Sequence, residues 1–387
     1  MNSPRFTISD KIIYIISPEY WGTMFVSKHH YAIELAKKGN TVYFIEPPLL
    51  TNKKISIRKV DNAEGVFVVS YKPVMRGERF LPAFIYHLLV KQQIRLLQKA
   101  IGKKPDIVWS FDVFRFANLK WFGAAVNLLH AVDFFTRNDI PGEARSADIC
   151  ICSSEGIKKV IQKGGRPTFF INHGLNEKFC AKSLAWLQTL AEVKPVVKVQ
   201  AGYIGNLLMG ALDRVAMQKV IEQNPDIHFH FWGQIEDGKG GLVGYRVPEV
   251  YAFMDFLKQR SNVSLYGPVP IFDIYDQLTK MDMFWLCWSL RTSKIWNEYT
   301  NPHKILEYLS TGKPLVSHFM DTYKNSELID MMPDHNNEKY PELFASVVER
   351  VKKAESLQKQ QSRIQFALDN SYKKQIERIE LLIKDVA

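Results

Sequence analysis

The sequence has few cysteines, four in 387 residues, which excludes a disulfide scaffold. Cys150 and Cys152 lie in one strand-like run. No further ligand lies near them in the sequence, so we expect buried thiols there rather than a metal site. The chain also lacks any run of 18 apolar residues, so no segment is predicted to span a membrane. The apolar stretch Ile12 to Ile16 is too short for a signal peptide. These absences favour a protein of the reducing cytoplasm.

Acidic residues are scarce in the first half of the chain. Residues 1–185 contain 27 basic and 15 acidic residues, whereas the remainder contains 24 and 25. This imbalance indicates an anionic partner for the first half only. Nucleic acid and an anionic membrane surface are both candidates. The alternative is a surface whose charge only keeps the protein in solution.

The composition is otherwise ordinary for a folded globular protein, with 46% apolar and 24% charged residues. Short apolar strand-like runs alternate with helical patterns, and this alternation restarts near residue 199. Such βαβ alternation predicts mainly parallel sheets. We therefore predict an α/β fold with two doubly wound Rossmann-like domains facing a cleft. The predicted parts are a first domain over 1–180, a linker over 181–198, a second domain over 199–365, and a C-terminal helix over 366–387 packing back on the first domain.

The segment from Asn301 to Val316, NPHKILEYLSTGKPLV, carries the clearest chemical signal. Asn301 suits an N-cap and Pro302 suits the first helical position. Lys304 adds a cation near helical N–H groups that would suit a diphosphate. Glu307 lies one turn deeper and could accept hydrogen bonds from vicinal hydroxyls, as on a ribose. The alternative is a solvent-facing ion pair between Lys304 and Glu307.

This segment resembles the donor-binding signature of GT-B glycosyltransferases, which in bacterial members has the pattern Pro-x-Lys-x-x-Glu-Tyr-Leu-x-x-Gly-Lys-Pro. Four other stretches resemble parts of that family in the same order: Ile171–Asn176, Ala201–Asn206, Asn224–Gly233 and Asn262–Pro270. The resemblance implies an acceptor-binding first domain and a donor-binding second domain. The donor site that it implies consists of Gly205, Asn206, Tyr266, Asn301, Pro302, His303, Lys304 and Glu307.

The first half is similar to a narrower group of bacterial polysaccharide glycosyltransferases, including glucuronosyltransferases. The similarity lies in Trp21, in the stretch Lys28 to Val42 and in Phe44 to Pro48. It implies a hexosyl transfer from a nucleotide-sugar, with UDP as the expected nucleotide, to a glycan or lipid-linked glycan acceptor in surface polysaccharide assembly. We expect no cofactor and no metal, because no Asp-x-Asp motif and no His/Cys cluster occurs.

Within that group an Asp follows the fourth or fifth strand, and Asp133 fits this place. We predict Asp133 as the general base on the acceptor hydroxyl; the alternative is an N-cap or loop residue. Glu19, Trp21 and His130 are predicted to contact the acceptor. His130 is also the rival base, although strand alternation would place it on a different face from Asp133. The alternative for His130 is a histidine that only packs within its strand and contacts no acceptor.

The segment Arg79 to Lys104 mixes apolar and basic side chains, and Phe80 to Ile101 within it is predicted to form a long helix. Such a helix suits the interface of an anionic bilayer, here the inner face of the cytoplasmic membrane. The alternative is that its apolar face packs on the sheet.

Two other classes of protein stay open. A GT-B sugar-nucleotide epimerase would share the fold, but its carboxylate and histidine constellation is not found in register. A nucleic-acid-binding protein would explain the positive charge, but no recognition module supports it. We therefore expect no nucleic-acid partner.

Overall fold

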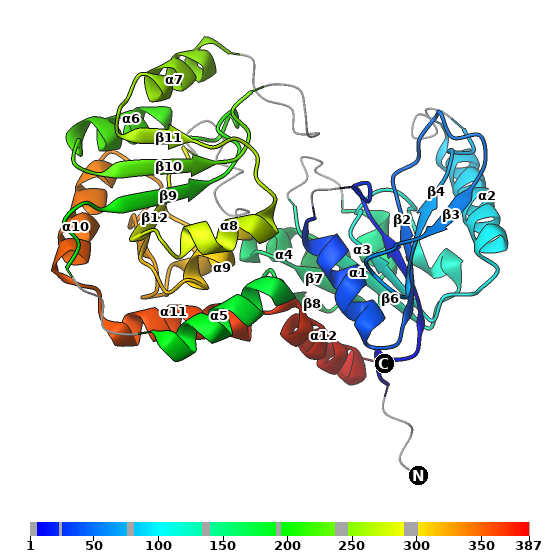
Figure 1. The fold of residues 1–387 in the computed structure, drawn as a ribbon. Coiled ribbons are helices and arrows are strands. Elements are labelled where there is room, and N and C mark those ends of the chain that lie inside the picture. Colours follow the sequence, from blue (N-terminus) through cyan, green and yellow to red (C-terminus); the bar gives the residue numbers. More distant parts are fainter. Residues whose placement is uncertain are drawn as a thin grey trace. The chain divides into compact units, whose positions relative to one another are not determined.

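The computed structural model describes residues 6–22, 25–75, 81–133, 140–190, 195–236, 247–289 and 301–386. The chain forms two compact units (Figure 1). Unit 1 consists of residues 1–173 and 372–387, and unit 2 consists of residues 174–371. Each unit has its own mainly parallel sheet with helices packed against it. The predicted α/β class with two doubly wound domains is confirmed.

Unit 1 contains an eight-stranded sheet in the order β3-β4-β2-β1-β5-β6-β7-β8. All neighbouring strands are parallel except β3 and β4, which are antiparallel. Most strands are apolar on both faces, as parallel strands covered on both sides must be. The strands are β1 (Ile12–Ile16), β2 (Thr41–Ile45), β3 (Ser56–Lys59), β4 (Val66–Ser70), β5 (Ile107–Ser110), β6 (Val126–Ala131), β7 (Ile149–Cys152) and β8 (Thr168–Phe170).

The C-terminal helix of the chain belongs to unit 1. Its apolar side chains Ile376, Ile379 and Ile383 join the same core as α1, and Lys38 after α1 pairs with Glu380 at 3.0 Å. Figure 1 shows the two helices side by side. The helices of unit 1 are α1 (Ser27–Lys37), α2 (Ala83–Ile101), α3 (Gly142–Ser146), α4 (Glu155–Ile161) and α12 (Tyr372–Val386), with 3-10 turns at Leu119–Phe122 and Gln162–Gly164.

Unit 2 contains a six-stranded parallel sheet in the order β11-β10-β9-β12-β13-β14. Its strands are β9 (Gln200–Ile204), β10 (His228–Trp232), β11 (Val263–Leu265), β12 (Met283–Leu286), β13 (Leu315–Ser317) and β14 (Asp330–Met331). Its helices are α5 (Glu177–Thr189), α6 (Arg214–Gln223), α7 (Pro248–Lys258), α8 (Ile271–Leu278), α9 (Lys304–Leu309), α10 (Tyr340–Lys353) and α11 (Leu357–Asp369), with a 3-10 turn at Asp321–Tyr323.

The structure divides the chain at places other than those we predicted. The first unit ends at residue 173 rather than 180, and α5 occupies much of the predicted linker over 181–198. The Asn176 side chain accepts the N–H of Phe179 at 3.0 Å and so starts α5 inside unit 2. The chain returns to unit 1 at residue 372, so residues 366–371 belong to unit 2.

The helix predicted over Phe80 to Ile101 is present as α2, from Ala83 to Ile101. Residues 76–80, which include Arg79, lie outside the described residues. One stripe of α2 packs into unit 1 through Val90, Ile94 and Leu97. No helix among the described residues combines the length and apolar character needed to cross a bilayer.

Candidate functional site

The strand order of unit 2 reverses between β9 and β12. The chain leaves β9 toward β10 and β11 and later returns to the other side of β9 as β12. In open parallel sheets, ligands bind outside the carboxyl ends of the strands at such a reversal. Gly205 and Asn206 directly follow β9, and α9 belongs to the connection that leaves β12. The predicted donor residues Gly205, Asn206 and Asn301 to Glu307 therefore lie on the connections that leave these two strands, whereas Tyr266 follows β11.

Two glycine loops contact each other at the carboxyl ends of β9 and β10. The Gly205 N–H donates to the Trp232 carbonyl at 2.8 Å, and the Gly233 N–H donates to the Gly267 carbonyl at 2.8 Å. Gly233 has a φ of +133°, and a Cβ atom there would overlap the Gly205 carbonyl oxygen. Only glycine permits this approach. Gly233 is a site-shaping residue that the sequence analysis did not single out.

Asn206 shapes the loop that follows β9. Its Oδ1 accepts the N–H of Leu208 at 2.9 Å. The Arg214 guanidinium donates to the carbonyl oxygens of Leu207 and Met209, at 3.2 and 2.7 Å. The backbone of this loop is therefore fixed by hydrogen bonds with the side chains of Asn206 and Arg214.

Tyr308 fastens α9 to the end of β9. Its hydroxyl accepts the N–H of Ile204 at 2.7 Å and lies 3.2 Å from the Ile204 carbonyl oxygen, to which it can donate. The ring is fully buried and stacks on Phe284 of β12 at 4.6 Å. This side chain joins α9 to both strands that flank the reversal. Its role could not be predicted from the sequence, because both partners lie far from it along the chain.

Glu307 is a buried carboxyl group with an unused acceptor. The residue is 7% exposed, and its Oε2 has no hydrogen-bond partner within the described ranges. Its Oε1 lies 3.8 Å from Nε2 of His303. Burial raises the pKa of Glu307 to about 7, although the charge of Lys304 acts in the opposite direction. A carboxylate oxygen left unpaired in this way is suited to a hydroxyl donor from a ligand.

Lys304 supplies positive charge beside this carboxyl. Burial lowers the pKa of Lys304, while Glu307 raises it. A buried ammonium group is costly unless an anion pairs with it. The alternative, a solvent-facing ion pair of Lys304 and Glu307, is a poor description, because the Glu307 carboxyl is buried and Lys304 is half-buried.

The predicted start of this helix is wrong. The helix begins at Lys304, and its N-cap is His303, whose side chain makes no capping bond. The preceding turn has i→i+3 bonds, from the Ile305 N–H to the Pro302 carbonyl and from the Leu306 N–H to the His303 carbonyl. Asn301 is not the cap; its Oδ1 accepts the Tyr323 hydroxyl at 3.2 Å.

Tyr266 lies just after β11, and its ring stacks on the aromatic side chains of Trp232 and His230 on β10. Its ring stacks on Trp232 at 5.0 Å, and its hydroxyl lies 2.8 Å from Nδ1 of His230. Nε2 of His230 meets the Gln200 side-chain oxygen at 2.8 Å. Burial lowers the pKa of His230 to about 4, so this network keeps a neutral histidine near pH 7. Tyr266 remains 47% exposed and can contact a ligand.

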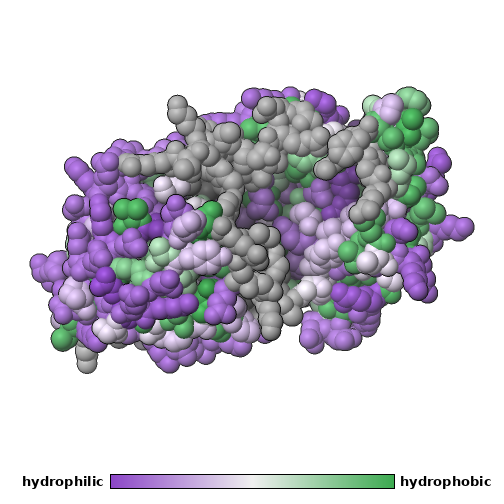
Figure 2. All heavy atoms as spheres, turned by 90° about the horizontal axis from the view of Figure 1, so that it is seen from above, coloured by the Kyte–Doolittle hydropathy of each residue, from purple (hydrophilic) through white to green (hydrophobic). Residues whose placement is uncertain are grey.

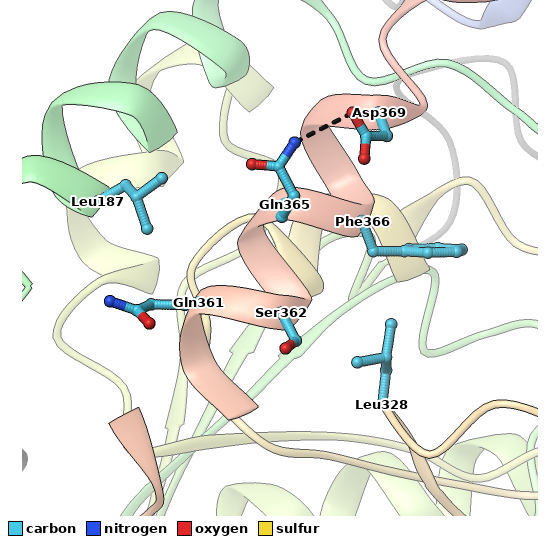
Figure 3. A pocket seen from close by; sticks show the side chains of 7 residues that line it. All are labelled: Leu187, Leu328, Gln361, Ser362, Gln365, Phe366 and Asp369. Carbon is cyan, nitrogen blue, oxygen red and sulfur yellow. Dashed lines mark hydrogen bonds between the residues drawn. The ribbon is translucent and has the colours of Figure 1, made fainter. Parts of the chain in front are cut away.

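A hollow of about 640 Å³ lies on another side of unit 2 (Figure 3). The labelled side chains come from α5, from α11 and from the loop before β14, and none of the predicted donor residues lines it. Asp369, its one charged residue, accepts a hydrogen bond from Gln365 at 3.0 Å. Across the described part of the chain, no three His, Cys, Asp or Glu side chains lie together as metal ligands would.

In unit 1 the corresponding reversal lies between β1 and β5. Glu19 follows β1 and Asp133 follows β6, and the structure brings both to one lysine. The ammonium group of Lys28, near the start of α1, lies 2.6 Å from Oε2 of Glu19 and 3.5 Å from Oδ2 of Asp133. The Lys28 side chain is 2% exposed, whereas Glu19 and Asp133 are 42% and 76% exposed.

Lys28 was missed by the sequence analysis. A signal was present, because Lys28 shares a helical face with Tyr31, Ala32 and Leu35, which are all buried. A lysine on the buried face of a helix needs an anionic partner.

Trp21 and His130 are packed more deeply than we predicted. The Trp21 ring contacts His29 and Phe44, and the backbone N–H of Trp21 donates to Oε1 of Glu46 at 2.8 Å. His130 is 1% exposed, and its Nδ1 accepts the Trp109 indole N–H at 3.3 Å. Burial holds the pKa of His130 well below its usual range. His130 thus occupies the packed strand position that was the alternative, with no exposed surface for an acceptor.

Three solved structures show the same fold as this chain. Sucrose-phosphate synthase from Thermosynechococcus elongatus superposes with a TM-score of 0.66 at 11% identity, over 97% of this chain and 99% of that one. A trehalose-6-phosphate protein from E. coli, bound with UDP-2-fluoro glucose, gives 0.65 at 10% identity over 97% and 99%. HepE from Anabaena, in complex with UDP-glucose, gives 0.61 at 12% identity over 97% and 100%.

These likenesses establish the architecture. The chain has the GT-B fold, as the sequence resemblance implied. At such low identity they carry no residue-level assignment. Neither the family models nor the curated proteins that were compared with the sequence match it.

Proposed function

We propose that the protein is a glycosyltransferase that takes a hexosyl group from a UDP-sugar bound by unit 2 and transfers it to an acceptor hydroxyl bound by unit 1. The observation that carries the proposal is the buried Glu307 carboxyl with its unpartnered oxygen, beside the positive charge of the half-buried Lys304. Vicinal ribose hydroxyls complement the carboxylate, and a diphosphate complements the ammonium. The solved structures of similar fold from E. coli and Anabaena hold UDP-sugars, which supports the choice of nucleotide.

In the proposed reaction the acceptor oxygen forms a bond to the anomeric carbon while the bond from that carbon to the diphosphate breaks. The diphosphate leaves with the bonding electron pair, and the hydroxyl proton passes to the Asp133 carboxylate. Asp133 is suited to this role by its exposure and by its place after β6. Lys304 and backbone N–H groups would meet the charge of the leaving nucleotide, so the proposal needs neither a metal nor a cofactor.

The acceptor that we propose is a glycan or lipid-linked glycan of bacterial surface polysaccharide, reached from the cytoplasmic side of the membrane. The support lies in α2, which contains no acidic residue. Its outer face carries Phe84 and Leu88, which are 68% and 63% exposed, followed by the exposed basic residues Lys91, Arg95 and Lys99. Figure 2 shows hydrophobic residues gathered at the right-hand end of the view, where α2 and its neighbouring strands lie in Figure 1. Apolar and basic side chains on one helix face suit an anionic lipid surface.

The nucleotide is tested by thermal-shift measurements with UDP-, GDP-, ADP- and CMP-sugars, and we expect stabilisation by the UDP-sugar. Calorimetric titration then tests the site. Lys304→Ala and Glu307→Ala should each weaken binding by about 1–3 kcal/mol, the scale of a lost hydrogen bond to a charged group. Lys352→Ala and Glu349→Gln, which break an exposed pair on α10, should leave the curve unchanged. Wild-type curves for both site variants would remove α9 from the donor site.

The alternative enzyme class is separated by the products. Incubation of the UDP-sugar without acceptor should yield slow hydrolysis to free sugar and UDP. Conversion into a second UDP-sugar would instead identify an epimerase and contradict the proposed transfer.

A further inference from the structure

The helix α9, which carries Lys304 and Glu307, is only six residues long. A single helix of this length is not stable in water through its own hydrogen bonds. Its N-cap His303 makes no side-chain capping bond, and Tyr308 fastens its body to β9. The position of Glu307 therefore depends on the contacts of α9 with the rest of unit 2.

Two side chains from other helices donate to the carboxyl end of α9. The Trp186 indole N–H, on α5, donates to the Thr311 carbonyl at 3.0 Å. The Tyr275 hydroxyl, on α8, donates to the Ser310 carbonyl at 3.4 Å, and it lies 3.1 Å from Oγ of Ser183 on α5. The two helices therefore bind α9 at carbonyl groups that the hydrogen bonds within a helix leave free.

A third helix, α11, binds the next carbonyl with a charged group. The Arg363 guanidinium donates to the Gly312 carbonyl at 3.2 Å and to the Leu328 carbonyl at 3.0 Å. Arg363 is 1% exposed, and its guanidinium lies 3.8 Å from a carboxylate oxygen of Glu355. A cation just beyond the carboxyl end of a helix complements the partial negative charge of that end. Arg363 thus stabilises the end of α9 both by hydrogen bonding and by charge.

The carbonyl groups of residues 306–312, at the carboxyl end of α9, all accept a hydrogen bond. The hydroxyls of Ser310 and Thr311 donate to the carbonyls of Glu307 and Tyr308, both at 2.7 Å. The carbonyls of residues 306 and 309 accept backbone N–H groups, and those of residues 310–312 accept the three side chains described above. A helix end that is satisfied in this way frays less than a free end. The Glu307 carboxyl thus lies one turn before a fixed point.

We propose that Trp186, Tyr275 and Arg363 are positioning residues for donor binding. By holding the carboxyl end of α9, they keep the unpartnered Oε2 of Glu307 where hydroxyl groups of the nucleotide can donate to it. Hydrogen bonds weaken steeply as their distance and angle depart from the optimum, so a small movement of this short helix costs affinity. None of the three side chains needs to touch the nucleotide. The inference rests on the proposed donor site.

The test compares Trp186→Phe with Asp276→Asn in the full chain. Trp186→Phe keeps an aromatic ring on α5 but removes the donor to the Thr311 carbonyl. Asp276→Asn breaks an exposed ion pair between α8 and α5, with Lys182 at 2.6 Å, and so controls for the contact between these two helices. In calorimetric titration Trp186→Phe should bind the UDP-sugar about 3- to 10-fold more weakly, the scale of one lost hydrogen bond. Asp276→Asn should bind it as the wild type does.

The kinetic constants separate positioning from general destabilisation. In Trp186→Phe the KM for the UDP-sugar should rise by the same factor, while the KM for the acceptor keeps its wild-type value. The addition of Tyr275→Phe should weaken donor binding further. Wild-type affinity in the single and the double variant, with a lowered melting temperature, would overturn the inference and leave these side chains purely structural. An equal loss of affinity in Trp186→Phe and Asp276→Asn would also overturn it, because the effect would then belong to the packing of α5 on α8.

Hydrogen exchange tests the anchoring of α9 without any ligand. The N–H groups of residues 308–310 should exchange about 3- to 10-fold faster in Trp186→Phe than in the wild type, because local opening of α9 then breaks one hydrogen bond fewer. Unchanged exchange refutes the inference. If exchange changes as expected but the wild type binds no UDP-sugar, the proposed function fails, whereas the anchoring of α9 stands.

Discussion

At the scale of single residues, Glu307 should couple the binding of the nucleotide-sugar to the loss of a proton. Its ordinary pKa lies near 4.5, and burial raises it to about 7. The ionised form is therefore disfavoured in the folded protein, and the stability contribution of the neutral form is lost as the pH rises from about 4.5 through 7. Hydroxyl groups of a ligand would favour the ionised form, so donor binding should lower this pKa.

We predict that UDP-sugar binding at pH 6.5 releases protons and that this release fades by about pH 8.5. Affinity should fall as the pH drops below 7, because the carboxyl must first give up its proton. Calorimetric titrations in buffers of different ionisation enthalpy measure the proton release directly. The Glu307→Gln variant should bind with little pH dependence; the same proton release in that variant would assign it to another group.

The residues of the donor motif were predictable because they follow one another in the sequence. Lys304 and Glu307 are three positions apart on one short helix, so their proximity needs no tertiary information. The grouping of Lys28 with Glu19 and Asp133 was not predictable in this way, because the three residues are separated by up to 114 positions, from Glu19 to Asp133. Asn301 failed as a predicted cap because Tyr323, from a distant 3-10 turn, binds its side-chain oxygen.

At the scale of elements, the loops after β9 and β10 depend on a glycine. We predict that Gly233→Ala disrupts unit 2 and abolishes donor binding, because the new methyl group would meet the Gly205 carbonyl and the backbone would keep a φ of +133°. Gly267→Ala is the matched control, since Gly267 also has a positive φ but leaves room for a Cβ atom.

The control should lose only about 1 kcal/mol, the cost of a left-handed alanine. Urea unfolding and calorimetric titration measure both variants. Equal losses in the two would show that the close approach of the loops adds nothing to the backbone strain.

Most strands and helices were predictable because parallel strands are apolar on both faces and stand out in the sequence. The edge strand β3 was not, because all four of its residues are exposed and two are basic. Such an edge carries no hydrophobic signal, and its basic residues protect the sheet from further pairing. The helix α5 overlaps the predicted linker over 181–198, which was assigned because the stretch lacks a clear strand and reads as a linker with a helical part.

At the scale of the whole molecule, the uneven charge predicts binding to anionic vesicles. The protein should co-sediment with anionic liposomes at low salt and be released by high salt, with little binding to neutral liposomes. Charge reversal of Lys91, Arg95 and Lys99 on α2 should weaken this binding, since each basic residue near the surface contributes about 1 kcal/mol.

Charge reversal of Lys352 and Lys353 on α10 of unit 2 is the control and should have little effect. Phe84→Ser with Leu88→Ser should also reduce sedimentation without loss of stability, because both side chains are largely exposed. No sedimentation of the wild type with anionic vesicles at low salt would contradict membrane attachment and favour a dissolved acceptor.

The order of the chain also sets an order in time during synthesis. Unit 2 is enclosed between the two segments of unit 1, and Tyr372, Ile376, Ile379 and Ile383 of α12 complete the core beneath α1. The ribosome makes these side chains after all of unit 2. Unit 2 is therefore fully synthesised while the core of unit 1 still lacks one helix, so unit 1 is begun before unit 2 and completed after it.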